Sequence, residues 1–407
     1  MELKPKYQYS YFIKPYIIEK ENYKSYIEKL LDNPKIKIKE FEKERDLDIY
    51  SYFLPNIRET IFKTFTFKLD ESINSNKEKL DRILKLTVVN FSYELDKNIE
   101  VNENKEDGLV FGVSKIEIMC FNTGVCFLIL KTYVDNMKEF TDILNFNYKF
   151  KEINSEFLNL KNFEKINLKI DNFEDIDNLK KVLYNITDNS LKNEIDDENF
   201  YVYSYACIDG EVWSKDSDFE KFKFDFYKFA NLLQGNNNVD LNIESEDGMK
   251  IISKWDCTRI GITKNSTVLL TSNINTFNYT NMPHKYENEY LYTFLISLYQ
   301  KIYLKNLSFK FRNKDKLEKY RKNLNQFIKN IWSVEITKEE TGSLLYSNWR
   351  ETLDVQNIYL EVMSVYDVKI KEKENEKDKK INKILWIIVV VCLLINLIDF
   401  AILMSIK

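Results

Sequence analysis

One stretch near the end of the chain, residues 384–406, constrains the fold most. It reads ILWIIVVVCLLINLIDFAILMSI, and Asp399 is its one carboxylate. At 1.5 Å of rise per residue, a helix of this length spans roughly 35 Å, more than the roughly 30 Å hydrocarbon core of a bilayer. The stretch therefore predicts a transmembrane helix. The sequence holds no second apolar run of this length.

Basic residues gather on one side of this stretch. Only Lys407 follows it, whereas the residues before it include four lysines: Lys377, Lys379, Lys380 and Lys383. Because lysine and arginine favour the cytoplasmic side of a membrane, this asymmetry places the preceding chain in the cytoplasm. The sequence thus predicts a single-pass protein of the inner (cytoplasmic) membrane, with the lipid bilayer as its first partner.

Three polar side chains share one face of the predicted helix. Cys392, Asn396 and Asp399 follow one another at steps of four and three residues. A charged Asp inside a bilayer costs about 2.5–3.5 kcal/mol, so something should compensate it. In a homo-oligomer these residues would line a polar pore that attracts cations. The alternative is an anchor in which Asp399 is protonated and Asn396 bonds a neighbouring helix.

Composition excludes several classes of function. Acidic and basic residues nearly balance, 64 against 60, so no strong positive field predicts nucleic-acid binding. The chain has one histidine, His284, and five cysteines without C-x-x-C spacing, which argues against a zinc site and a histidine-dependent triad. Phosphate-binding glycine loops are also absent from the sequence. We expect no enzyme and no catalytic residue; a divalent cation is the one cofactor left open.

The first 280 residues predict an α+β domain. Strand-like runs cover 8–13, 60–69 and 86–95. Residues 114–121 and 125–133 predict a hairpin about the turn Asn122-Thr123-Gly124, in which Cys120 and Cys126 face each other as buried thiols. A helix over 135–146 would complete half of a ferredoxin-like sandwich.

A second unit of the same kind is predicted beyond a boundary near 150–175. It has helices over 175–186 and 218–233, the latter ended by Gly235, a strand over 200–208, and a hairpin from 255–263 to 267–271. This similarity suggests a duplicated α/β unit. Three side chains alternate on one face of the strand, where sheet core is favoured over a base-stacking platform: Tyr201, Tyr203 and Tyr205. The acidic pairs Asp216/Asp218 and Asp196/Asp197 are expected in solvated loops.

From residue 285 onward the pattern becomes helical. We expect helices over 287–311, over 314–331, and from 338 through the charged residues to 383, with Leu345, Trp349 and Leu353 at helical spacing. The expected organisation is thus an α+β domain over 1–280, a helical stalk over 285–383 and the transmembrane helix over 384–406.

The helical third resembles CorA-like membrane proteins. The resemblance lies in 292–307, 321–332 and 340–353, and it includes the Tyr299-Gln300 step, the Leu345-Tyr346 pair and Trp349. It implies a CorA-like α/β domain, a pentamer and ion transport. The chain departs from the family because it has one apolar helix and no Gly-Met-Asn tripeptide. No metal site is therefore carried over.

Three functions remain open at the sequence level. The first is an oligomeric ion-conducting channel or transporter gated by its cytoplasmic domain. The second is a CRISPR-associated antiviral-defence membrane effector gated by a small nucleotide signal, since CorA-like proteins also accompany bacterial defence systems. The third is a non-conducting tail-anchored scaffold. The sequence assigns no ligand-binding residues.

Overall fold

The computed structural model describes most of the chain in two compact units. The described residues are 3–63, 76–95, 108–152, 168–191, 199–237, 248–313, 317–332 and 335–405. At 76–77, 313, 317–319, 330, 396–397 and 399–405 only the backbone is described. The first unit comprises Met1–Tyr303 and Gln326–Gln356, and the second comprises Leu304–Asn325 and Asn357–Lys407.

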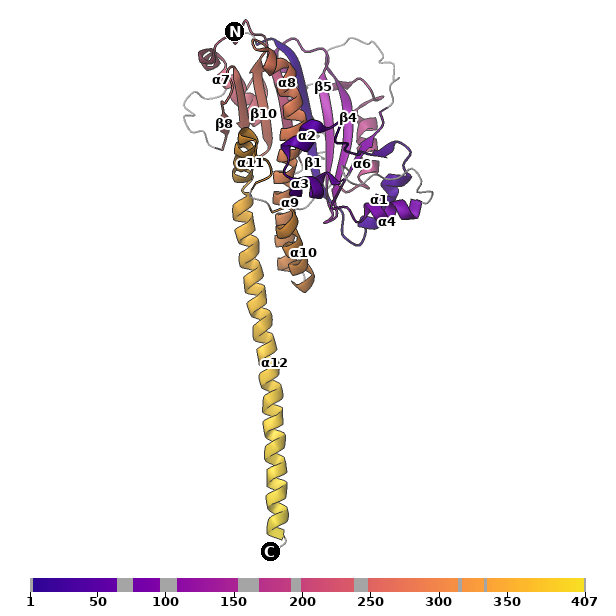
Figure 1. Cartoon of the computed structure of the whole chain (residues 1–407), viewed down its shortest axis with the longest axis vertical. Helices are drawn as coiled ribbons and strands as arrows, with labels where there is room; N and C mark the ends of the chain where they lie inside the picture. Colours follow the sequence, from indigo (N-terminus) through magenta and orange to yellow (C-terminus); the bar gives the residue numbers. More distant parts are fainter. Residues whose placement is uncertain are drawn as a thin grey trace. The chain divides into compact units, whose positions relative to one another are not determined.

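The first unit is built on one mixed sheet of ten strands (Figure 1). Its order is β2 (Ile36–Ile38), β3 (Val88–Tyr93), β4 (Leu109–Phe121), β5 (Val125–Val134), β1 (Pro5–Ile17), β7 (Tyr201–Ile208), β10 (Ser266–Ser272), β9 (Thr258–Ile262) and β8 (Lys250–Ile252), with β6 (Leu168–Ile170) beside β4. β1 pairs with both β5 and β7, so strands of both predicted units belong to one sheet. The α+β composition was predicted, but this sheet was not.

The hairpin between β4 and β5 forms as the sequence predicts. Gly124 in the turn has φ +93°, a conformation that glycine adopts without strain. Cys120 lies opposite Cys126 in the ladder, and both are buried thiols. Burial raises the pKa of Cys120 well above its ordinary value, which keeps this thiol protonated and unreactive.

Helices cover one face of the sheet and contribute to its two apolar cores. They are α1 (Tyr23–Asp32), α4 (Asn76–Ile83), α5 (Phe140–Phe150), α6 (Ile176–Ile186) and α7 (Lys223–Asn231). Phe12 of β1 packs its ring against Phe146 and Phe150 of α5. Asp175 caps α6 by accepting a bond from the Asn178 N–H, as its position before an apolar helical pattern suggests.

The opposite face is covered by a long helical segment (Figure 1). It consists of α8 (Thr276–Lys285), the π-helical turn η4 (Tyr286–Tyr290) and α9 (Leu291–Asn313). Tyr9, Tyr203 and Tyr205 donate their hydroxyls to the carbonyls of Pro283, Tyr286 and Asn278 at 2.7–2.8 Å. Pro283 lies inside α8 without an N–H, so the regular ladder fails just before the π turn. The tyrosines Tyr201, Tyr203 and Tyr205 are buried, as the core interpretation predicted.

Several predicted helix and strand boundaries were wrong. The helix expected over 218–233 starts as the 3₁₀ turn η3 (Asp216–Lys221), and Leu232, not Gly235, takes the left-handed conformation that ends α7. The expected third helix is divided into α11 (Glu340–Thr352) and α12 (Val355–Ser405), because Asp354 has φ +59°. α10 (Leu317–Asn330) lies where predicted. The strand expected over 60–69 begins inside α3 (Pro55–Ile61), which follows α2 (Leu47–Tyr52); residues 64–69 lie outside the described residues.

The predicted transmembrane helix is contradicted. Among the residues that the structure describes, no helix is both long and apolar enough to cross a membrane. Residues 384–406 fall largely within α12, where the apolar run with described side chains covers only 384–395. The predictions of a transmembrane channel and of a single-pass location in the inner membrane are corrected with it.

Candidate ligand-binding site

The candidate site lies at a gap in the sheet, along one edge of β4. On this edge β6 pairs with the beginning of β4, up to Phe111, and β3 pairs with it from Ile116 onward. In the described part of the chain, no strand pairs with Ser114 and Lys115 on this side. The ladder between β4 and β5 also shifts register here, between Val113 and Lys115. Two strands thus diverge from β4 and leave an opening between them.

A pocket of about 1190 Å³ occupies this opening. Its residues come from the position before β2, from the end of β3 and the two residues after it, from the bulged part of β4, from β5 and from the segment after β6: Lys35, Ser92, Tyr93, Glu94, Leu95, Val113, Ser114, Lys115, Tyr133, Asp171 and Asn172. This volume is large enough for a nucleotide-sized molecule.

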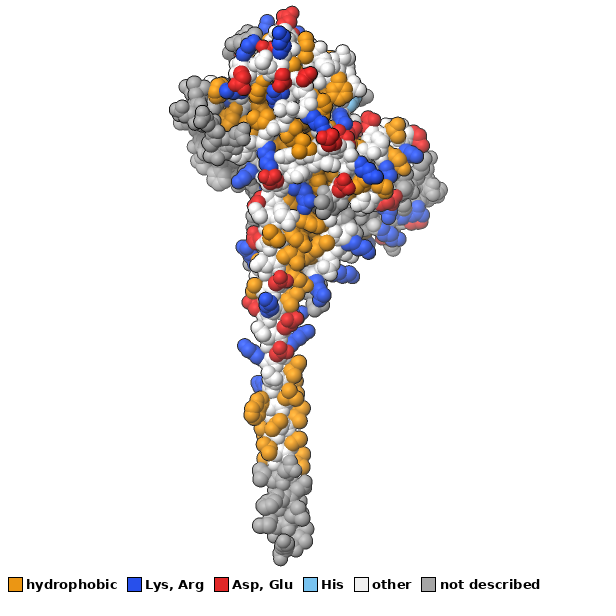
Figure 2. All heavy atoms as spheres, turned by 60° about the vertical axis from the view of Figure 1, so that its left-hand side comes forward, with side chains coloured by type: hydrophobic (Ala, Val, Ile, Leu, Met, Phe, Trp, Pro, Cys, Tyr) orange, Lys and Arg blue, Asp and Glu red, His pale blue; other side chains and the backbone are white. Residues whose placement is uncertain are grey.

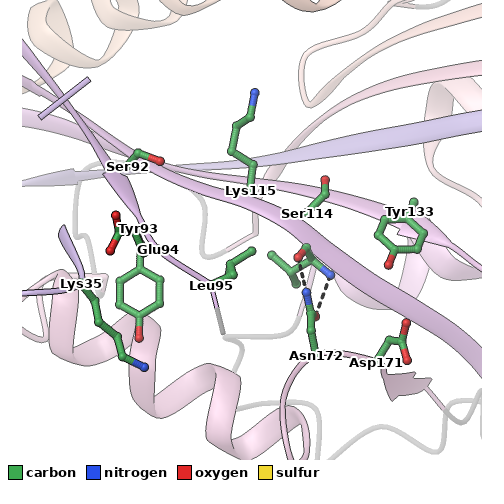
Figure 3. Close-up of a pocket in the computed structure, with 11 residues that line it drawn as sticks. Lys35, Ser92, Tyr93, Glu94, Leu95, Ser114, Lys115, Tyr133, Asp171 and Asn172 are labelled. Carbon is green, nitrogen blue, oxygen red and sulfur yellow. Dashed lines mark hydrogen bonds between the residues drawn. The ribbon is translucent and has the colours of Figure 1, made fainter. Parts of the chain in front are cut away.

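Asn172 fixes one wall of the pocket. Its Oδ1 accepts the Val113 N–H at 3.0 Å, and its Nδ2 donates to the Val113 carbonyl. Both bonds appear in Figure 3, where the Asn172 side chain meets the backbone of β4. The amide side chain therefore continues the pairing of β6 for one more residue and holds the bulge of β4 in place.

Aromatic rings contribute the flat surfaces of the pocket. Tyr93 ends β3, and the Lys35 ammonium lies 5.9 Å from its ring centroid. The ring of Tyr133 lies against Gly112, its cross-strand partner, where a Cβ would come within 2.4 Å of the ring. Gly112 thus creates the space that Tyr133 occupies. Burial, aided by the nearby Asp171 and Asp135 carboxylates, raises the pKa of Tyr133, so it stays a neutral hydrogen-bonding group.

The pocket adjoins a charged cluster through Lys115. In Figure 3 the side chains of Lys115 and Ser92 point to one side of the sheet, and those of Tyr93 and Asn172 to the other. On the first side, Lys115 Nζ lies 3.3 Å from Oε1 of Glu287 in η4. Glu287 also binds Lys131 Nζ at 2.6 Å and the Tyr11 hydroxyl at 2.5 Å.

Glu287 is ionised in this cluster. Burial opposes its charge, but the attraction of Lys131 and Lys115 outweighs this effect and lowers the pKa of Glu287 to about 2. Two ammonium groups therefore face one carboxylate. The neighbouring Glu117 is separately paired with Lys39 at 2.8 Å. Within the cluster three lysines thus face two glutamates, while the rest of the pocket lining adds one lysine, Lys35, and two carboxylates, Glu94 and Asp171.

The lining groups suit the binding of a molecule with a planar ring and an anionic group. Two phenol rings can pack against the ring, the Ser92 hydroxyl can donate a hydrogen bond, and Lys35 and Lys115 can attract the anion. Glu94 and Asp171 also line the pocket, so the anion has to bind at one of the lysines and away from these carboxylates. Within the described ranges, His, Cys, Asp and Glu form no group of three or more that could hold a metal.

The residues predicted as functional from the sequence lie elsewhere in the chain. Cys392 is an exposed residue of α12, and the side chains of Asn396 and Asp399 lie outside the described residues, so their shared face stays a prediction. The four lysines predicted to precede a membrane are exposed on α12: Lys377, Lys379, Lys380 and Lys383.

Both aspartates of the pair 216/218 have structural contacts. Asp216 binds Arg259 through both carboxylate oxygens, at 2.9 and 2.7 Å, and Asp218 accepts the backbone N–H of Lys215 at the start of η3. Asp196 and Asp197 lie outside the described residues.

Sequence analysis singled out none of the polar residues that line the pocket. Two signals were present: Gly112 interrupts an otherwise well-formed strand, and glycine inside a strand often marks a bulge or a close approach. The second signal is weak: Asn172 is a polar residue just after a short apolar segment, and that segment has no strong strand pattern. Neither signal identifies the partner across the gap.

Comparison of the chain with known protein families, with curated proteins and with solved structures found no match.

Proposed function

We propose that the first unit is a sensor for a small nucleotide-like ligand, which binds in the pocket at the β4 gap. The observation that carries this proposal is the pocket itself, which is lined by the rings of Tyr93 and Tyr133 and by Lys115, whose side chain extends to the other side of the sheet. Such a combination matches a base and a phosphate better than it matches a purely apolar molecule.

This proposal develops the nucleotide-gated alternative from the sequence. A CorA-like protein of antiviral defence would need a site for its signal, and the pocket has suitable size and chemistry. Ion conduction would require a membrane span, which the described residues do not provide. The proposal therefore concerns recognition of the ligand and leaves conduction aside.

We further propose that copies of the chain associate through α12. Apolar side chains from Ile384 to Ile395 are exposed, with Trp386 at 70%, and Figure 2 shows them as a hydrophobic band on the lower part of this helix. Apolar surface of this extent marks an interaction site. A chain truncated after Lys383 should be monomeric in light scattering while the full chain is oligomeric. The same number of chains per particle for both would overturn this proposal.

The ligand proposal is tested by calorimetric titration with AMP and adenosine. Both should bind, and Tyr93→Leu should weaken both about tenfold because a base loses its stacking surface. The control is Tyr279→Leu, which removes an exposed tyrosine of α8 outside the pocket and should leave binding unchanged. The proposal would be overturned if neither AMP nor adenosine binds the wild-type chain, or if Tyr93→Leu and Tyr279→Leu weaken binding equally.

A further inference from the structure

We propose that the anionic group of the ligand binds Lys115 and displaces it from Glu287, so that ligand binding is coupled to the π turn η4. This inference rests on the proposed ligand site and adds to it a specific anion subsite and its competitor. The competitor is a carboxylate of the protein itself, which occupies Lys115 when no ligand is present.

Lys115 is the lysine of the cluster that can be released. Its side chain is 36% exposed and lies 3.3 Å from Glu287, whereas that of Lys131 is 16% exposed and lies at 2.6 Å. Lys131 is also held over the rings of Tyr9 and Tyr11, at 4.7 and 5.7 Å from their centroids. An incoming anion therefore reaches Lys115 at a lower cost than Lys131.

Release of Lys115 leaves no buried charge without a partner. Glu287 keeps its bond to Lys131 and accepts the hydroxyl of Tyr11. A buried carboxylate that lost every partner would be strongly unfavourable, and that cost is avoided here. The exchange replaces one ion pair of Lys115 by another, so the free-energy difference between the two arrangements is small enough for a ligand to reverse.

The other lysine of the pocket is a weaker candidate for this role. Lys35 lies beside Tyr93, on the far side of the site from Lys115 (Figure 3). Its ammonium faces the Tyr93 ring and not the buried carboxylate of η4. An anion bound at Lys35 would therefore leave Glu287 undisturbed, and the experiment below distinguishes the two positions.

Coupling to η4 follows from the position of Glu287. It lies one residue after Tyr286, whose carbonyl accepts the hydroxyl of Tyr203, and within the one described turn whose backbone is π-helical. If ligand binding weakens the ion pair between Lys115 and Glu287, then any change that weakens this ion pair must strengthen ligand binding by the same factor, because linkage is reciprocal.

The test compares AMP with adenosine, which differ by the phosphate. Glu287→Gln keeps the size of the side chain but removes its charge, so it should raise the affinity for AMP about tenfold and leave that for adenosine unchanged. Lys115→Met should reduce the affinity for AMP to that for adenosine. The matched control is Glu220→Gln, the same change at an exposed glutamate that pairs with Lys223 outside the pocket lining, which should alter the affinity for AMP less than twofold.

The outcomes separate this inference from the function on which it rests. If neither compound binds the wild-type chain, the ligand site itself is refuted. If both bind, but Glu287→Gln affects them equally or Lys115→Met leaves AMP binding intact, the ligand site stands and the Lys115 subsite is refuted. Loss of the preference for AMP in Lys35→Met alone would assign the anion to Lys35. Lys115→Met alters a partly exposed side chain, so it gives a result even where Glu287→Gln does not fold.

Discussion

Two carboxylates of the turn η4 have pKa values displaced in opposite directions. Glu287 is lowered to about 2, whereas Glu289 is raised to about 7. Burial is the main cause of the increase at Glu289. Lys285, at 3.6 Å, opposes it, and the negative charges of Asp48 and Glu339 add to it. Glu289 therefore titrates near neutral pH while its neighbour stays charged.

This displacement predicts how stability depends on pH. Between pH 4.5 and about 7 the folded chain retains the Glu289 proton that the unfolded chain has released. The folded state then binds more protons, so the contribution of Glu289 to the free energy of unfolding is fully present below pH 4.5 and is lost as the pH rises through 7. The difference between the pKa of Glu289 in the unfolded chain, 4.5, and in the folded chain, about 7, corresponds to about 3 kcal/mol. Because the side chain is still 14% exposed, we expect about 2 kcal/mol.

Glu289→Gln should remove this dependence. Glutamine resembles the protonated acid, so the variant should match the wild type at pH 4.5 and be more stable by about 2 kcal/mol at pH 8. Urea unfolding followed by tryptophan fluorescence at several pH values measures the difference, and titrations common to both chains cancel. Glu287→Gln is the opposite case: it should be less stable than the wild type at pH 7, and that deficit should disappear as the pH falls toward 2. A Glu289→Gln effect that is constant across pH, or destabilising at pH 8, would refute the reasoning.

Two further predictions concern the walls of the pocket. Asn172→Ala should lower the free energy of unfolding by about 1–3 kcal/mol, because both bonds to Val113 are lost, and should weaken AMP binding. Asn136→Ala removes comparable bonds to Val110 and Gly108 outside the pocket lining, so it should affect stability and leave AMP binding intact. Gly112→Ala should cost about 1–3 kcal/mol because its Cβ would overlap the Tyr133 ring. The same change in a Tyr133→Ala background should cost less, and equal costs in both backgrounds would show that the ring is not the obstacle.

The parts of the fold that follow from local pattern were predictable. The β4–β5 hairpin has strand residues on both sides of a turn with glycine at the position of positive φ. The cap of α6 is likewise formed by an aspartate directly before the helix. In both places the deciding interaction joins residues a few positions apart, so the sequence contains it.

The pocket could not be predicted for the opposite reason. It exists because β3 and β6 pair with different parts of β4, and because Asn172 reaches back to Val113, 59 residues away. Periodicity indicates which face of a strand is apolar, but it does not indicate where a partner strand stops. The alternation of Tyr201, Tyr203 and Tyr205 identified a buried face correctly, yet their bonds to the segment from Asn278 to Lys301 depend on a helix far along the chain.

The turn η4 has contacts that make it a suitable element for transmitting ligand binding. On the side of the sheet, Glu287 meets Lys115 of the pocket. On the other side, Lys285 lies 3.5 Å from Glu339, whose carboxylate accepts the Gly342 N–H at the start of α11. Glu289 lies between these contacts and shares Lys285 with Glu339. A change in the contacts of Glu287 therefore affects a turn that is also linked to the start of α11 through the ion pair between Lys285 and Glu339. If the two carboxylates act as one unit, the effects of Glu287→Gln and Glu289→Gln on unfolding should not add, whereas additive effects would mean that the pocket and α11 respond independently.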